Sequence, residues 1–374
     1  MSELSVINAR RPAAFAAVSD EEWSDWRWQH AHRLRTAEAL SAVIRLRDDE
    51  RQACERATER FPLAVTPYYA SLMRPDDPGC PIRLQAIPRL AELERHPSDL
   101  ADPLAEDEHR VAGALTHRYP DRAMLYTTHS CAVYCRHCNR RRKVGDPTSA
   151  PSKDDLRAAV AYLRQHPEVR DVLVSGGDPL SLSDERLDEL LGSLRAIPHL
   201  EIIRVATRAV VTLPQRVTRD LVGVLRRHQP IYVATHFNHL AECSSEAAAA
   251  LYALADGGAV IVNQMVLLKG INDDPAMVGR MNQWLLKNRC RPYYIFQCDP
   301  AVGISHFRTP IAAGLEIIEA LRGFTSGLAV PHYVVDLPGG GGKVSLQPEY
   351  LLRREGKRLT FRNYLGKTFV YDEV

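Results

Sequence analysis

The 374-residue sequence lacks a hydrophobic run long enough to cross a membrane, and it lacks an excess of either charge. A membrane-spanning helix needs roughly 18–20 consecutive apolar residues, and no apolar stretch here approaches that length. Near the N-terminus, Arg10 and Arg11 precede only a short apolar run at residues 13–18, which is too weak for a signal peptide. With 48 basic and 46 acidic residues the formal net charge is +2, so the composition gives no reason to expect a nucleic acid or a membrane as partner.

Cysteine is sparse as well, with eight residues in the chain. So few cysteines in a chain of this length, three of them clustered, do not form the dense pattern of a disulfide-stapled secreted domain. The composition therefore predicts a globular protein of the reducing cytoplasm. The clustered residues Cys131, Cys135 and Cys138 follow the apolar, strand-like run 123–128 with the spacing C-x3-C-x2-C.

The cysteine cluster has no fourth member, and this absence restricts its chemistry. Electron-transfer iron–sulfur clusters are held by four cysteines. Three thiolates leave one iron open to a small molecule, and an open metal position permits catalysis. The alternative is a structural zinc site, which takes four ligands in closely spaced pairs, and His129 or His137 would complete such a set. The spacing favours an open iron–sulfur cluster and leaves zinc as the alternative.

Two patterns divide the rest of the chain. Residues from about 20 to 110 combine helical apolar spacing with frequent prolines, which indicates helices and extended segments that wrap another body. From about residue 120, strand-like runs alternate with helix-like stretches, a rhythm typical of parallel βα units. The expected strands are residues 124–128, 172–174, 202–206, 231–234, 260–268 and 292–296. The expected helices are residues 153–165, 184–196, 214–227, 245–256 and 275–287.

These patterns predict an α/β fold with three parts. We expect a helical N-terminal region at 1–110, a partial (β/α)6 barrel at 111–335 and a short C-terminal extension at 336–374. In (β/α) barrels the chemistry lies at the carboxyl ends of the strands. The three cysteines follow the first expected strand, Ser175–Asp178 follows the second, and Asp299 lies just beyond the sixth. The candidate residues therefore share one rim.

Three further motifs carry charges suited to ligand binding. The loop Asp336–Lys343 contains four consecutive glycines, which let backbone approach a ligand closely, and its terminal lysine is a Schiff-base candidate. Asp299 and Asp336, each just beyond a strand-like run, would together favour a cation. Arg118 and Arg122 are spaced to clamp a phosphate. Taken singly, each motif also has an ordinary explanation: a flexible linker, helix-capping aspartates or salt-bridging arginines.

Together the motifs resemble the lysine 2,3-aminomutase family of radical S-adenosylmethionine (SAM) enzymes. The cysteine loop, which continues into Asn-Arg-Arg-Arg, and the PGGGGK loop carry the resemblance most specifically. Similar segments at 25–28, 117–122, 175–178, 235–239, 292–299 and 306–310 extend it over nearly the whole chain from about residue 20. The resemblance implies an isomerase in which reductive cleavage of SAM gives a radical that takes hydrogen from the substrate β-carbon. The α-amino group then moves to that carbon.

The resemblance also assigns cofactors and residue roles. A [4Fe–4S] cluster would be held by Cys131, Cys135 and Cys138. SAM would be held by Ser175, Gly176, Gly177, Asp178 and His236. Pyridoxal 5′-phosphate (PLP) would be carried by Lys343, with Arg118 and Arg122 toward its phosphate and Gln264 near its ring. The substrate would be bound at its α-carboxylate by Arg140 and at its distal cation by Asp299 and Asp336.

The acidic pair predicts the substrate class. Leaving a buried charge unpaired costs about 3–5 kcal/mol, so a pocket with both Asp299 and Asp336 favours a cationic amino acid over glutamate or alanine. We expect conversion of L-lysine to L-β-lysine, with L-arginine as the nearest alternative because a guanidinium satisfies the same pair. A relative that modifies a lysine on a translation factor is a further alternative. A zinc-stabilised module that binds nucleic acid through the basic run at 140–143 is disfavoured by the net charge and the lack of a second basic stripe.

The resemblance carries further expectations about partners. The sequence ends at Val374 without the cysteine-bearing tail that binds zinc in bacterial lysine enzymes of this family, and Asp274 stands at the corresponding upstream position. We therefore expect no structural zinc. We expect a cytoplasmic homo-oligomer, lacking the support that such tails give, which takes a small-molecule amino acid and electrons from a flavodoxin- or ferredoxin-type reductant.

Overall fold

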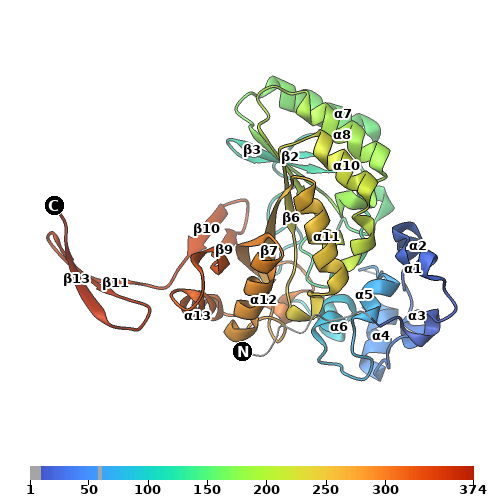
Figure 1. The fold of residues 1–374 in the computed structure, drawn as a ribbon, viewed down its shortest axis with the longest axis horizontal. Coiled ribbons are helices and arrows are strands. Elements are labelled where there is room, and N and C mark those ends of the chain that lie inside the picture. The colour runs from blue at the N-terminus through green and yellow to red at the C-terminus, as the bar shows by residue number, and fades with distance from the viewer. Residues whose placement is uncertain (1–9, 58–60) are drawn as a thin grey trace.

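The computed structural model describes residues 10–57 and 61–374. Its centre is a ten-stranded sheet in which the strands follow sequence order from β1 to β10 (Figure 1). Strands β3 to β9 are parallel, whereas β1 and β2 at one edge and β10 at the other are antiparallel to their neighbours. The strands are β1 Arg110–Ala112, β2 Leu115–Tyr119, β3 Arg122–Tyr126, β4 Asp171–Ser175, β5 Ile202–Ala206, β6 Ile231–Thr235, β7 Val260–Leu267, β8 Cys290–Gln297, β9 His332–Leu337 and β10 Gly342–Leu346.

Helices join the consecutive parallel strands. They are α7 Lys153–Gln165, α8 Asp184–Arg195, α9 Ala209–Thr212 with α10 Arg219–Arg227, α11 Ser245–Asp256, α12 Pro275–Lys287 and α13 Ile311–Leu321. The repeated units confirm the expected partial (β/α)6 barrel, and β9 adds a seventh parallel strand. The helix expected at 214–227 is interrupted because Thr218 starts α10 as its N-cap, after a short 3-10 turn at Pro214–Arg216.

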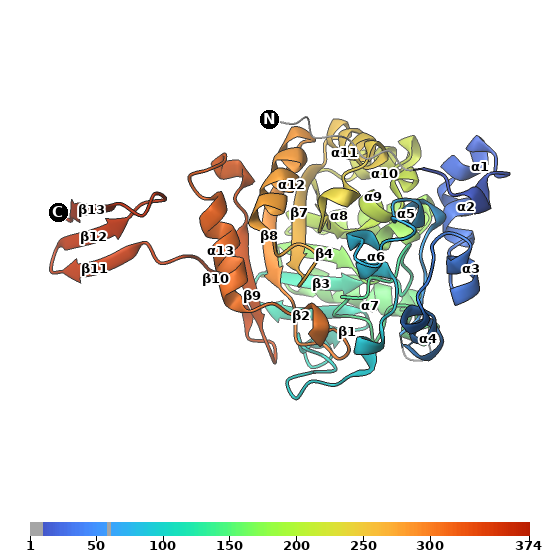
Figure 2. The same ribbon diagram turned by 90° about the horizontal axis from the view of Figure 1, so that it is seen from below.

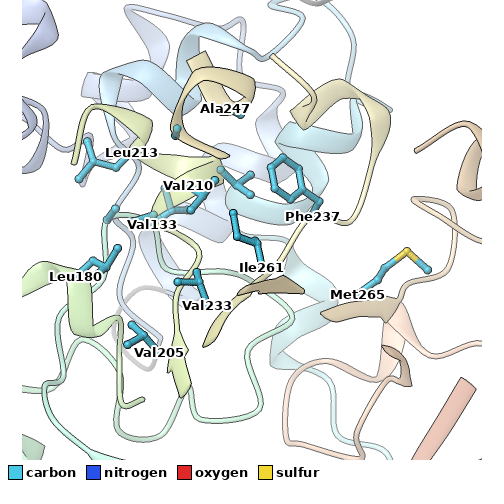
Figure 3. Close-up of a cluster of buried hydrophobic side chains, with 14 of the residues drawn as sticks. Val133, Leu180, Val205, Val210, Leu213, Val233, Phe237, Ala247, Ile261 and Met265 are labelled. Atoms are coloured by element: carbon cyan, nitrogen blue, oxygen red, sulfur yellow. The ribbon is translucent and has the colours of Figure 1, made fainter. Parts of the chain in front are cut away.

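The main core lies between the sheet and its covering helices. Residues on alternate positions of neighbouring strands, such as Val205, Val233 and Ile261, are buried together with Val210 from α9. Figure 3 shows this cluster, and Val133 from the cysteine loop lies within it. Val133 is only 3% exposed. Burying such a side chain contributes roughly 1.5–3 kcal/mol, so the cysteine loop is anchored in the hydrophobic core.

The barrel is open, and side chains cross between its edges. Edge strands β1 and β10 are the two ends of the sheet. Arg118 from β2 forms an ion pair with Asp336 from β9, with 2.9 Å between nitrogen and oxygen. The Tyr119 hydroxyl accepts a hydrogen bond of 2.9 Å from the backbone N–H of Lys343 in β10. These contacts join strands that share no backbone ladder.

Short helices of the N-terminal region pack beside the barrel (Figures 1 and 2). They are α1 Asp20–Ser24, α2 Trp26–Ala31, α3 Ala37–Ser41, α4 Asp48–Ala57, α5 Pro67–Ser71 and α6 Pro81–Ala86. The Tyr69 hydroxyl donates to Glu242 at 2.7 Å, and Thr66 donates to the Thr212 carbonyl at 2.6 Å. These hydrogen bonds join the N-terminal region to the segments after β5 and β6. Within the described residues, no helix combines the length and apolar character needed to span a bilayer.

The C-terminal segment forms a separate three-stranded sheet that projects from the body in both ribbon views (Figures 1 and 2). Its strands are β11 Leu351–Glu355, β12 Arg358–Arg362 and β13 Thr368–Asp372. The division expected at 335/336 falls inside β9, and β10 continues the barrel sheet beyond it. Lys343 therefore belongs to the edge of the barrel and not to the projecting sheet.

Candidate active site

The cysteine loop follows β3 and is clamped by a buried ion-pair network. Glu92 is fully buried and accepts hydrogen bonds from Arg136, with Nε at 2.9 Å, and from Arg141. Burial by itself would raise the pKa of Glu92, but the two guanidinium groups hold it below its usual value. One carboxylate thus fixes two positions of the loop that carries Cys135 and Cys138.

The basic run at 140–143 is paired within the protein. Arg140 lies 2.7 Å from Glu106, Arg142 lies 2.8 Å from Asp102, Lys143 lies 2.5 Å from Asp107, and Arg141 contacts Glu92. This internal pairing argues against the alternative in which the run at 140–143 forms an open nucleic-acid-binding face. Loops from residues 92–107 neutralise these cations, and they lie too far away in sequence to be identified as partners from the motif alone.

Two of the three cluster cysteines, Cys131 and Cys138, lie in buried surroundings that disfavour a bare thiolate. Burial raises the pKa of the Cys138 thiol to about 11, with a further contribution from Cys135. Burial also raises the pKa of Cys131 well above its usual value, assisted by the charges of Asp178 and the other two cysteines. Positive charge nearby would offset this effect at Cys131 and Cys138, and metal coordination deprotonates thiols directly. Three thiols gathered under this constraint fit an iron–sulfur centre.

The alternative zinc ligand His137 is engaged elsewhere. Its buried ring lies 5.5 Å from the ring of His236, and its Nε2 lies 3.3 Å from the side-chain amide of Asn238. In the part of the chain that the structure describes, no three His, Cys, Asp or Glu side chains converge on the position of a single metal ion. None of the eight cysteines, all of which lie in the described residues, forms a disulfide.

The two glycines after β4 are required for close packing against the cysteine loop. A Cβ on Gly177 would meet the Ser130 carbonyl oxygen at 2.4 Å, and one on Gly176 would meet the Thr128 oxygen at 2.7 Å. Gly176 also has φ of +139°, which favours glycine. The turn after the second predicted strand therefore abuts the cluster loop, as the shared-rim argument predicts.

The Asp178 carboxylate is directed at protein groups. It accepts hydrogen bonds from the Thr207 hydroxyl at 2.7 Å and from the Arg208 backbone N–H at 2.8 Å. Its backbone N–H donates to Ser130 at 2.8 Å. In this structure Asp178 joins the loops after β3, β4 and β5, so we assign its side chain to holding these loops in position.

Arg140 is held by a protein carboxylate and lies near the end of strand β4. Its Nε donates to Glu106 at 2.7 Å, and one terminal nitrogen lies 3.3 Å from the Ser175 hydroxyl. Glu106 is itself buried, at 5% exposure. The sequence predicted that Arg140 binds the carboxylate of a substrate. The structure adds a protein carboxylate, that of Glu106, which holds the side chain at its Nε edge.

Lys343 and Asp336 lie opposite each other at the turn between β9 and β10. They are register partners, and the Lys343 ammonium lies 2.9 Å from the Asp336 carboxylate. The same carboxylate binds Arg118 at 2.9 Å through its other oxygen. The expectation that Asp336 lies beyond a strand is wrong, because pairing with β10 extends β9 to Leu337. The lysine is likewise in a strand, with its ammonium 5.5 Å from the ring of Phe296.

Asp299 follows β8 and shares an electrostatic environment with this group. It accepts a 2.7 Å hydrogen bond from Asn139, the residue after Cys138. Burial raises the pKa of Asp299 to about 6, and the Asp336 charge adds to this, whereas Asn139, Lys343 and Arg140 oppose it. The structure thus brings the expected acidic pair into mutual range beside Lys343, Arg140 and the cysteine loop.

Three other expected residues, Arg118, Arg122 and Gln264, lie beside aromatic residues. Arg118 and Arg122 both lie against the ring of Tyr119, at 5.0 Å and 4.3 Å from its centre. Gln264 in β7 is the register partner of Tyr294 in β8, so both face the same side of the sheet as Phe296.

His236 comes directly after β6, and its buried Nε2 has no partner among the described residues. Burial lowers the pKa of His236 to about 3, with a further contribution from the charge of Arg208, so the ring is neutral and free to accept or donate one hydrogen bond.

Several residues of this site were not identified from the sequence. Arg208 comes two residues after β5, on the predicted rim, and its position alone was a usable signal. Asn139 adjoins Cys138, and Tyr119 lies between the two predicted arginines. Glu106 precedes β1 in an irregular segment and carries no sequence signal.

Comparison with known proteins identifies the family of this chain. Residues 318–374 match the profile "Lysine-2,3-aminomutase", and residues 125–278 match "Radical SAM superfamily". The L-lysine 2,3-aminomutase of Bacillus subtilis (strain 168) is 48% identical over 95% of this chain and 76% of its own length. That of Fusobacterium nucleatum is 47% identical over 99% of this chain and 87% of its own length. The glutamate 2,3-aminomutase of Clostridioides difficile (strain 630) is 42% identical over 98% and 87%, respectively.

Each of these relatives is more than 40% identical to this chain over at least 95% of its length. The chain belongs to the lysine 2,3-aminomutase family of radical SAM enzymes, which are isomerases.

Proposed function

We propose that this protein is a PLP-dependent 2,3-aminomutase whose substrate is a cationic amino acid, with L-lysine first. The observation that carries the proposal is the grouping of Asp299 and Asp336 beside Lys343 and Arg140. Relatives named for lysine and for glutamate are both similar to this chain, so overall identity does not choose between them. Two carboxylates in one pocket oppose a second acidic group and favour an ammonium or guanidinium.

The pocket has a defined polarity. Arg140, fixed by Glu106, provides the positive end for an α-carboxylate, and forked guanidinium contacts suit that group. Asp299 and Asp336 provide the negative end for the distal cation. Because Asp336 pairs with Lys343 in this structure, a substrate cation would replace the lysine ammonium as its partner.

Lys343 is the proposed PLP attachment site. The aromatic rings of Tyr119 and Phe296 border its ammonium at 5.8 Å and 5.5 Å, and Arg122 provides a cation for a phosphate beside Tyr119. When bound, the cluster and SAM supply a hydrogen-abstracting radical and PLP supplies the carbon through which nitrogen migrates. The protein's part is to hold these groups in register and to exclude water.

The attachment site can be tested without turnover. We expect borohydride treatment of PLP-loaded protein, followed by peptide mass spectrometry, to find a pyridoxyl group on Lys343. In Lys343→Ala the label and the associated absorbance should be lost, whereas Lys367→Ala, which alters an exposed lysine of the projecting sheet, should keep both. Labelling of another lysine in the unmodified protein would contradict the assignment.

We also propose a homo-oligomer that uses the projecting C-terminal sheet. All residues of β13 are exposed, including Phe369 at 55% and Tyr371 at 61%. A small sheet with apolar side chains in water has little core of its own, and a second copy would cover it. Sedimentation analysis of Phe369→Ser/Tyr371→Ser is expected to give a smaller species than the unmodified chain, and an unchanged mass would contradict this surface.

The substrate test is an anaerobic assay of reconstituted protein with SAM, PLP and a flavodoxin- or ferredoxin-type reductant. L-lysine, L-arginine and L-glutamate are compared, with products separated by mass-resolved chromatography. A β-amino acid from lysine, in preference to arginine, supports the proposal, and preferred turnover of glutamate would refute the role of the acidic pair. Cleavage of SAM without any isomer would favour the alternative of a protein lysine as substrate.

The cytoplasm, a reducing compartment, is the expected setting for an enzyme with free cysteines.

A further inference from the structure

Arg208 lies between the cysteine loop and a buried polar network, and it is not among the residues proposed to bind the substrate or a cofactor. It follows β5, and its side chain is 9% exposed. One terminal nitrogen of its guanidinium, Nη1, donates a hydrogen bond to the sulfur of Cys135 at 2.6 Å.

The opposite side of the guanidinium is immobilised. Nη2 donates to Gln85 at 2.6 Å and to Glu242 at 2.7 Å, and Nε donates to the His236 carbonyl at 3.3 Å. Glu242 is fully buried and also accepts from the Tyr69 hydroxyl at 2.7 Å. A network satisfied on every side is rigid, so the position of Nη1 against the sulfur is set by the fold and not by the cysteine.

The charged groups of this network are placed to affect the reduction potential of a cluster held by the cysteines. Arg208 is one cation, and Glu242 is its only carboxylate partner among the described residues. The remaining hydrogen bond goes to a metal-ligating sulfur. Reduction of an iron–sulfur cluster adds one negative charge, and hydrogen bonds to its sulfurs together with local charge set the potential at which this occurs.

We propose that Arg208 is a positioning residue that donates to the Cys135 sulfur and raises the reduction potential of the cluster, with Glu242 as the opposing charge. The inference rests on the three-cysteine cluster of the proposed function. The step is a one-electron reduction: an external low-potential reductant gives one electron to the oxidised cluster, no bond is broken, and no proton is transferred. Arg208 stabilises the added charge, whereas Glu242 destabilises it.

The test is an anaerobic redox titration of reconstituted, full-length protein, with dithionite as reductant and the reduced cluster followed by electron paramagnetic resonance. No amino acid is added, so absence of aminomutase activity would leave the result interpretable. Arg208→Met is expected to lower the ratio of reduced to oxidised cluster at a fixed potential at least tenfold, which corresponds to about 59 mV. Glu242→Gln is expected to raise the ratio by a comparable factor. Arg208→Lys, which keeps the charge and loses the fork, should fall between Arg208→Met and the unmodified protein.

The control is Arg83→Lys. Arg83 is also buried, at 1% exposure, and pairs with Glu50, so it reports any general effect of changing a buried arginine. It should not move the midpoint. Iron and sulfide are measured in every variant, and if Arg208→Met does not retain a cluster, Glu242→Gln and Arg208→Lys decide. Shifts of the same sign for the Arg208 and Glu242 variants, or no shift in either, would overturn the proposal.

Discussion

Replacing Asp299 with asparagine should weaken substrate binding and stabilise the fold at the same time. Asn139 donates to Asp299 at 2.7 Å, and burial together with the Asp336 charge raises its pKa to about 6. A hydrogen bond to a charged group contributes about 1.5–3 kcal/mol. Loss of the carboxylate is therefore expected to lower kcat/KM for L-lysine about ten- to hundredfold, while the amide keeps the shape of the side chain.

The pH dependence follows from the direction of the pKa change. In the unmodified protein, kcat/KM for a cationic substrate should fall about tenfold for each pH unit below about 6, because the protonated carboxyl no longer attracts the cation. For stability, the folded state prefers the neutral form, so ionisation costs nothing at a pH below the unfolded pKa and costs up to about 3 kcal/mol above pH 6. Asp299→Asn should gain up to that amount at pH 8 and much less at pH 4.5.

Two measurements check this reasoning. Urea unfolding under anaerobic conditions at pH 8 and pH 4.5 gives the stability difference, and initial rates between pH 5 and pH 8 give the acid limb of the activity. Asp256→Asn is a matched control, because Asp256 is an exposed carboxylate that pairs with Arg289 and exposed pairs contribute little. An Asp299→Asn protein that is less stable at pH 8, or one that retains full kcat/KM for lysine, would refute the account of the pocket.

Other substitutions test the framework around the pocket. Arg140→Lys should raise KM for the amino acid about tenfold or more through loss of the forked contact, and steady-state kinetics would contradict this if KM were unchanged. Gly177→Ala places a Cβ 2.4 Å from a backbone oxygen of the cysteine loop, and should cost about 1–3 kcal/mol with lower iron content on reconstitution. Glu92→Gln leaves Arg136 and Arg141 without their buried carboxylate and should lower the free energy of unfolding by about 3–5 kcal/mol. Denaturant unfolding measures this loss, and an unchanged midpoint would show that the clamp is not structural.

Much of the barrel was predictable from local pattern. Helices α7, α11 and α12 occupy the expected residues, because each combines an N-cap side chain with apolar spacing on one face. The buried parallel strands read as continuous apolar runs and were identified for the same reason. Strands β1, β2, β9 and β10 were not among the expected strands. They are short or partly exposed edge elements, whose existence depends on pairing with a neighbour more than on their own composition.

The sequence by itself determined which chemical groups are available to the site. The spacing of the three cysteines and the glycine-rich approach to Lys343 are local features, and local features are written directly in the chain. Only the tertiary structure decided the partners. Arg118 meets Asp336 across 218 residues, and Arg208 meets Cys135 across 73. Which charges face each other depends on where packed strands and loops place them, and Coulomb interactions act over distances in space rather than along the sequence.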